Sequence, residues 1–153
     1  MAEPKFVPKP GQVDYTNIRY APVINVVVEH EGRVLLVQRS PDMHLYPSYW
    51  NGVSGFLDDA HSIEEKTTQE LFEEIGVAAK QIRSIERGSV ILQEAPKYNK
   101  TWLVVPVLAR IDTMEFKLDW EAITARWFAP SEVHKLQLWP GFEQVLGQFL
   151  SVL

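Results

Sequence analysis

The chain has 153 residues, a formal net charge of −5 and no cysteine. This length fits one domain with a proper hydrophobic core, and the negative charge argues against a broad surface for extended nucleic acid. The lack of cysteine excludes disulfides, thiolate zinc sites and cysteine nucleophiles. No apolar run reaches the length of a membrane span, and residues 1–11 lack the apolar core of a signal peptide, so we expect a cytoplasmic protein.

The first elements in chain order are an irregular arm and a hairpin. Residues 1–20 are rich in proline and predict an arm without regular structure, ahead of one domain at residues 21–153. Two runs rich in valine and leucine follow, at residues 21–29 and 33–39, with a glycine between them. Their continuous apolar character predicts a hairpin whose strands are buried on both faces.

One helix with well-marked ends comes next. A loop at residues 40–49 and a short strand at residues 50–53 lead into it. Ser62 is the expected N-cap, and Glu65 stands three residues later, where it completes a capping box. Gly76 is the expected glycine just after the last helical residue.

The same helix carries three clustered carboxylates. Glu70, Glu73 and Glu74 fall within roughly a 100° arc of the helix surface. Apolar residues occupy the neighbouring arc and can face a core. Three like charges on one face repel each other, and a divalent cation would turn that repulsion into binding energy.

The rest of the chain predicts three more strands and two short helices. Pro106 lies inside one of these strands, which predicts an edge position or a bulge. The order of elements indicates an α/β sandwich with a mixed sheet between helices. The expected elements are strands at residues 81–93, 101–111 and 125–128, a helix opened by Pro130, and a last helix after Pro140 with an apolar face of Phe142, Val145, Leu146, Phe149 and Leu150.

The segment at residues 55–77 resembles the Nudix box, the signature of the Nudix hydrolase family. Two positions differ from that pattern, since His61 and Gln69 replace a glutamate and an arginine that commonly form an ion pair behind the metal-binding glutamates. We expect the two replacements to act as a compensated, hydrogen-bonded support pair. The resemblance implies the Nudix-type α/β/α sandwich from about Val23 onward. The matching residues are Gly55, Glu70, Leu71, Glu73, Glu74, Gly76 and Val77.

The resemblance also implies an activity, namely metal-dependent hydrolysis of a diphosphate bond in a nucleoside diphosphate linked to another group. The implied metal ligands are the carbonyl of Gly55 and the carboxylates of Glu70, Glu73 and Glu74. Hard oxygen ligands of this kind suit Mg²⁺ or Mn²⁺. The implied catalytic residues are Glu73, Glu74 and Glu121, with Glu74 or Glu121 as the base that takes a proton from water.

Substrate contacts are expected from two loops near the box. The loop at residues 40–49 and the loop at residues 119–121 should flank one cleft, because ligand sites favour strand ends. Arg39 is the candidate for a phosphate contact, and Tyr46 and Tyr49 are candidates for the rest of the substrate. Arg39 and Glu121 have an equal alternative interpretation as plain surface charges. The expected partner is a small nucleotide-type molecule, and we expect no binding to a membrane. A homodimer stays open, because many members of the family are dimers.

Three other functions stay open at this point. A catalytically weakened Nudix-fold nucleotide-binding protein is favoured by His61 and Gln69 and opposed by the intact glutamates. An enzyme of the isopentenyl diphosphate isomerase type shares the fold and resembles the run YPSYWNGVSG, but it uses a catalytic cysteine that this chain lacks. The third is a structural protein with a chance motif. The sequence does not name a substrate.

Overall fold

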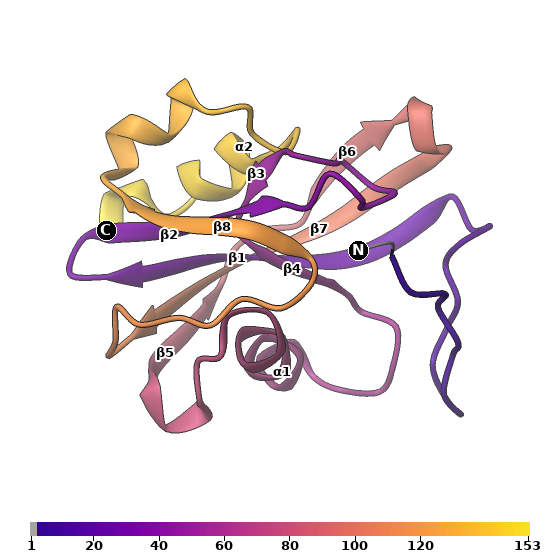
Figure 1. Ribbon diagram of the computed structural model, residues 1–153, viewed down its shortest axis with the longest axis horizontal. Coiled ribbons are helices and arrows are strands. Elements are labelled where there is room, and N and C mark those ends of the chain that lie inside the picture. Colours follow the sequence, from indigo (N-terminus) through magenta and orange to yellow (C-terminus); the bar gives the residue numbers. More distant parts are fainter. Residues whose placement is uncertain (1–2) are drawn as a thin grey trace.

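The computed structural model describes residues 3–153. Within these residues one eight-stranded mixed sheet has the main order β3-β2-β1-β7-β5, with α1 on one face and α2 on the other (Figure 1). The predicted α/β/α sandwich is therefore confirmed. The strands are β1 (Tyr20–His30), β2 (Arg33–Arg39), β3 (Trp50–Asn51), β4 (Val53–Phe56), β5 (Ile82–Arg87), β6 (Ile91–Ala95), β7 (Lys100–Ile111) and β8 (Ala122–Phe128). The helices are α1 (Ile63–Ile75) and α2 (Phe142–Gly147), with 3₁₀ turns at Ala79–Gln81, Pro96–Tyr98, Pro130–Lys135 and Leu150–Val152.

The central strand β1 organises the sheet. One of its edges pairs in parallel with β7, and the other pairs with β2 near His30 but with β4 between Val23 and Val26. Its buried side chains alternate, so that Val27 packs on the α2 side and Val26 on the α1 side. This burial on both faces is what the valine-rich run predicts. The exchange of partners from β2 to β4 places the start of the box loop beside the middle of the sheet.

The prediction of a single strand at residues 81–93 is wrong, because the structure has two strands there, β5 and β6. Both pair with β7, on either side of Pro106. Proline has no N–H to donate to the ladder, and its carbonyl accepts from the Gly88 nitrogen at 2.7 Å. The Gln148 side chain bonds both the N–H and the carbonyl of Ser89, at 2.7 and 2.9 Å. The Gln148 side chain, just after α2, thus takes the place of a neighbouring strand for the backbone of Ser89.

Two further boundaries differ from the sequence prediction. Strand β8 begins at Ala122, earlier than the expected start at Ala125. Helix α2 ends at Gly147, so Leu150 falls on a 3₁₀ turn instead of the helix face and is 53% exposed. The other four predicted apolar positions of this helix are buried. No helix within residues 3–153 is both long and apolar enough to cross a membrane.

The ends of α1 form as the sequence predicts. The Ser62 hydroxyl accepts from the Glu65 nitrogen at 3.1 Å, and the Glu65 carboxylate accepts from the Ser62 nitrogen at 2.9 Å. Gly76 adopts the left-handed conformation, with φ of 70°, and donates to the Phe72 carbonyl. These contacts fix the length and the position of the helix that carries the carboxylates.

Gly76→Ala should lower the free energy of unfolding by about 1–2 kcal/mol, because a left-handed conformation is unfavourable for a residue with a Cβ. The new Cβ would also lie 3.1 Å from the Cβ of Lys117. Gly147→Ala is the matched control, since this helical glycine has no heavy atom within 4 Å of an added Cβ. It should raise stability by about 0.5–1 kcal/mol in urea unfolding. Equal effects of the two changes would contradict the account of the helix end.

Candidate active site

Two glutamates of α1 lie near a third glutamate from a distant segment. Glu70 and Glu74 lie one turn apart on the helix, and each interacts with Glu121, which comes just before β8. The Glu121 carbonyl accepts from the Ser40 nitrogen at 2.7 Å, which ties its loop to the end of β2. A hydrogen bond joins the side chains of Glu74 and Glu121. Two carboxyl groups share such a bond only when one of them carries a proton.

Burial and mutual repulsion change the acidity of this cluster. Burial raises the pKa of Glu70 to about 8, and the negative charges of Glu73 and Glu121 add to the effect. Burial also raises the pKa of Glu74 well above its ordinary value, with further contributions from Glu121 and Glu70. The pKa of Glu121 is raised by burial and then by Asp119. The cluster therefore retains protons near neutral pH.

The cluster has the chemistry of a site for a hard divalent cation. The Oε2 atom of Glu74 is buried without a hydrogen-bond partner. Glu70 packs directly on the backbone of Gly55, since an added Cβ there would lie 2.6 Å from the Glu70 carboxyl carbon. Buried carboxylate oxygens beside a backbone carbonyl are the donors that Mg²⁺ and Mn²⁺ prefer. Within residues 3–153 no three acidic or histidine side chains already converge on one point, so shared ligation requires these side chains to turn.

Glu73 lies apart from the other two helix glutamates. It is exposed, and its carboxylate accepts from the Gln69 side chain at 3.1 Å. Its negative charge nevertheless raises the pKa of Glu70. Glu73 therefore lies within electrostatic reach of the cluster, at its solvent side.

A buried lysine that the sequence reasoning does not single out holds the box loop to the helix. The ammonium of Lys66 lies 3.2 Å from Asp58 and 2.8 Å from Asp59, and its side chain is only 4% exposed. The hydrogen bond from Lys66 lowers the pKa of Asp59 to about 2. Asp58 and Asp59, which follow β4, are its two anions. The sequence feature that could have identified Lys66 is its spacing, since it lies on the same face of the helix as Glu70 and Glu74.

The prediction that His61 and Gln69 hydrogen-bond to each other is wrong, because each side chain has a different partner. The His61 ring lies 2.9 Å from Asp59, while the Gln69 amide donates to Glu73. The positive charge that the arginine position lacks is supplied by Lys66, about one helical turn earlier. The support for the loop is thus an ion-pair cluster of different composition.

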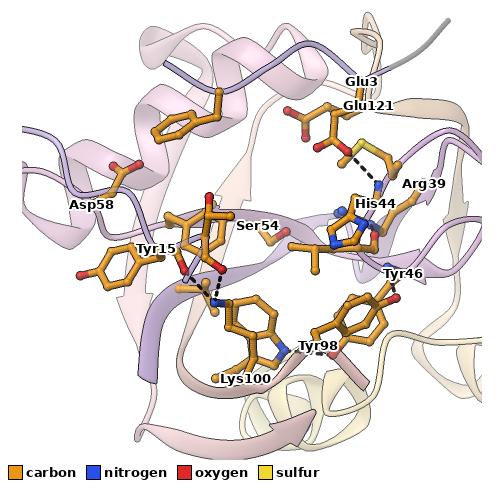
Figure 2. A pocket seen from close by; sticks show the side chains of 18 of the residues that line it. Glu3, Tyr15, Arg39, His44, Tyr46, Ser54, Asp58, Tyr98, Lys100 and Glu121 are labelled. Atoms are coloured by element: carbon orange, nitrogen blue, oxygen red, sulfur yellow. Dashed lines mark hydrogen bonds between the residues drawn. The ribbon is translucent and has the colours of Figure 1, made fainter. Parts of the chain in front are cut away.

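A cavity of about 540 Å³ opens beside the glutamates (Figure 2). Arg39 lines it, and its guanidinium donates to the Leu45 carbonyl at 2.9 Å. Tyr46 also lines it, with its hydroxyl accepting from the Trp102 indole at 2.9 Å. Tyr49 does not belong to the lining and packs edge-to-face on Tyr46. The expected cleft is present, since residues from both predicted loops and from the box line this one cavity.

Two other lining residues, Tyr98 and Tyr15, come from segments to which the sequence analysis gives no functional role. Tyr98 accepts from the Tyr46 nitrogen at 2.9 Å, and the His44 ring packs edge-on against the Tyr98 ring. Tyr15 stacks beside Phe56 with an angle of 6° between the rings. These contacts join segments far apart in the chain, so no local sequence pattern predicts them.

Comparison with known proteins gives one family. A family model described as the NUDIX domain matches residues 19–149. The NAD-capped RNA hydrolase NudC of Chromobacterium violaceum is 38% identical over 76 residues, which is 50% of this chain and 27% of that protein. The chain therefore spans about a quarter of the length of this curated relative.

Solved structures share the fold at low sequence identity. The MutT NUDIX hydrolase of Burkholderia pseudomallei has a TM-score of 0.73 and 19% identity, over 85% of this chain and 98% of that one. The NUDIX domain of Shewanella oneidensis NrtR, complexed with ADP ribose, has a TM-score of 0.70 and 20% identity, over 83% and 84%. At this level of sequence identity the two comparisons show that the fold is shared.

Replacing Lys66 with Met should lower the free energy of unfolding by about 3–5 kcal/mol, because Asp58 would be left as an uncompensated buried charge. Lys80→Met, at an exposed position after the same helix, should change it by less than about 0.5 kcal/mol. Urea unfolding of both variants provides the measurement. If Lys66→Met lowered the free energy of unfolding no more than Lys80→Met does, the Lys66 ion pairs would not hold the loop.

The glutamate cluster also predicts a pH dependence of stability in the presence of a chelator. The folded pKa of Glu70, about 8, lies above its ordinary value of 4.5, so the unfolded chain loses this proton first. The free energy of unfolding should therefore fall as pH rises from about 5 to about 8. Glu70→Gln should flatten this decline, whereas Glu143→Gln, at an exposed position of α2, should not. A wild-type protein that gains stability over this range would contradict the burial of the cluster.

Proposed function

The chain belongs to the NUDIX domain family, and from this membership we propose that it hydrolyses a diphosphate bond in a nucleoside diphosphate linked to another group, using a divalent cation. One observation carries the proposal. Glu70 and Glu121 line the same cavity as Arg39, and the buried Glu74 interacts with Glu121. Acidic groups for a cation and a fixed guanidinium for phosphate thus face one space large enough for a small ligand.

The relatives support the substrate class. The curated relative is named for NAD-capped RNA, and one structural neighbour was solved with ADP ribose. NAD and ADP ribose both contain a nucleoside diphosphate joined to a further group. Because this chain spans only 27% of the curated relative, its own substrate is part of the proposal.

The proposed ligands of the cation are the Gly55 carbonyl and the carboxylates of Glu70, Glu73 and Glu74. When bound there, Mg²⁺ or Mn²⁺ supplies positive charge for the diphosphate oxygens and lowers the pKa of water. Glu73 lies at the exposed edge, where one carboxylate oxygen accepts from Gln69 and the other is available to a cation. Glu70 and Glu74 would exchange their protons for the ion.

The base is proposed to come from the pair of Glu74 and Glu121. Their shared hydrogen bond leaves one carboxyl protonated and the other able to accept a proton. With Glu74 engaged as a ligand, Glu121 takes the proton of the attacking water. Burial raises the pKa of both glutamates, and the positive charge of Arg39 offsets part of that rise. The same charge is available to a phosphate of the substrate.

Tyr46 is the proposed contact for the group beyond the diphosphate. Its ring lines the cavity, and its hydroxyl is held by the Trp102 indole. Tyr49 acts only indirectly in this arrangement, since it packs edge-to-face on the Tyr46 ring. A rigid aromatic ring is suited to packing against a base or another flat group.

A second candidate is a Nudix-fold protein that binds nucleotides with little or no turnover. The observation that favours it is Gln69, which gives Glu73 a neutral amide donor where the family has an arginine. Cation-dependent release of mononucleotide products separates the two functions, because a binding protein gives none.

Glu121→Gln should lower kcat for a nucleoside diphosphate compound by about 10²–10⁴-fold, because it removes the proposed base while preserving shape. The assay measures Mg²⁺-dependent product release from NAD, ADP-ribose, dinucleotides, nucleotide sugars and nucleoside triphosphates. Glu143→Gln on α2 is the matched control and should retain activity. Hydrolysis that survives the Glu121 change, or that a chelator does not affect, would contradict the assignment.

A further inference from the structure

The segment before β1 forms a wall of the cavity. Residues 3–7 and 13–16 line it together with Met43, His44 and Leu45 of the loop after β2. Figure 2 shows Tyr15 of this segment and His44 of that loop on opposite sides. These residues form no helix or strand before Tyr20. The family model begins at residue 19, so this wall lies outside the matched domain.

The inner part of this wall is fixed by a buried lysine. The Lys100 ammonium donates to the carbonyls of Tyr15, Thr16 and Ile18, at 2.6, 3.1 and 2.5 Å. An ammonium has three N–H donors, and these three bonds use all of them. Lys100 is only 6% exposed, so the bonds are shielded from water. The backbone at residues 15–18 is therefore held in one place.

A second attachment joins the same wall to the Nudix box. The Val13 nitrogen donates to the Asp58 carbonyl at 2.6 Å, and the Gln12 amide donates to the Asp58 carboxylate at 2.9 Å. Asp58 is also an anion of the Lys66 cluster. The wall and the loop that leads into α1 consequently share one buried carboxylate.

The outer part of the wall is attached much more weakly. Glu3 accepts from the His44 nitrogen at 2.8 Å, which closes the cavity between the segment and the opposite loop. Every residue from 3 to 11 is exposed, and Phe6, which lines the cavity, is 46% exposed. A segment with so little buried apolar surface can open at low cost in free energy. The fixed inner part and the loose outer part together make a wall that can admit a small ligand.

The charges of this wall offer no net attraction to a polyanion. Between residues 3 and 16 the positive Lys5 and Lys9 are balanced by the negative Glu3 and Asp14. The rest of the lining sets Asp58, Glu70 and Glu121 against Arg39 and Lys100. The chain as a whole carries a net charge of −5. Binding of nucleic acid depends on lysine and arginine contacts with successive phosphates, and the three bonds of Lys100 to backbone carbonyls leave it no free donor for one.

We propose that residues 3–16 are part of the binding site and restrict it to small, free diphosphate compounds, excluding the same diphosphate when it carries a polynucleotide. This inference rests on the proposed function for its substrate class. Phe6 and Glu3 are the specificity-determining side chains, since Phe6 limits the space and Glu3 closes the mouth against His44.

The first test compares kcat/KM for NAD and for a short RNA that carries NAD at its 5′ end. The unchanged chain should prefer free NAD by at least about tenfold, and Glu3→Ala/Phe6→Ala should narrow that preference by about fivefold or more, mainly through KM for the RNA. Lys9→Ala is the matched control, because Lys9 lies in the same segment but outside the lining. Equal kcat/KM for the two substrates in the unchanged chain, or a preference that the double change does not alter, would overturn the inference.

The second test does not depend on turnover. Trypsin cleavage after Lys5 reports the accessibility of the outer wall, and the Glu121→Gln variant slows any hydrolysis during the assay. NAD should slow this cleavage by about fivefold, because the bound ligand keeps the segment closed, whereas the NAD-capped RNA should not. Protection by NAD without hydrolysis by the unchanged chain would refute the proposed function and leave this inference standing. Absence of protection by NAD would refute the inference even if hydrolysis occurs.

Discussion

The structure depends on the burial of Glu70, Glu74 and Glu121 close to one another, where their charged forms would repel each other. Burial raises the pKa of all three, so the isolated cluster is held together by protons. Such a site costs stability, and the surrounding fold offsets that cost. The caps at both ends of α1, the exchange of strand partners along β1 and the Lys66 ion pairs each hold one part of the cluster in place.

The sequence predicts well those features whose causes are local. The capping box of Ser62 and Glu65 and the glycine at position 76 depend only on neighbouring residues, and all three form as expected. The buried hairpin strands follow from continuous apolar runs in the same way. The fold and the helix that bears the glutamates could therefore be predicted without a structure, because these patterns lie within single elements.

Features that depend on distant partners could not be predicted in the same way. The break between β5 and β6 results from Pro106 in one strand and Gln148 near the end of the chain. Lys66 looks like an ordinary solvated lysine until the loop brings two aspartates to it. The role of Lys100 is invisible in the sequence because its acceptors are backbone carbonyls.

The most direct measurement is calorimetric titration of the protein with Mg²⁺ near pH 7, in buffers of different ionisation enthalpy. If the glutamate cluster holds protons that a cation displaces, binding should release about one proton per ion, and Glu70→Gln should reduce that release. The matched variant Glu143→Gln should release as many protons as the unchanged chain. Binding of Mg²⁺ without any proton release, or no binding at all, would contradict the claim that a divalent cation takes the place of protons among these buried carboxylates.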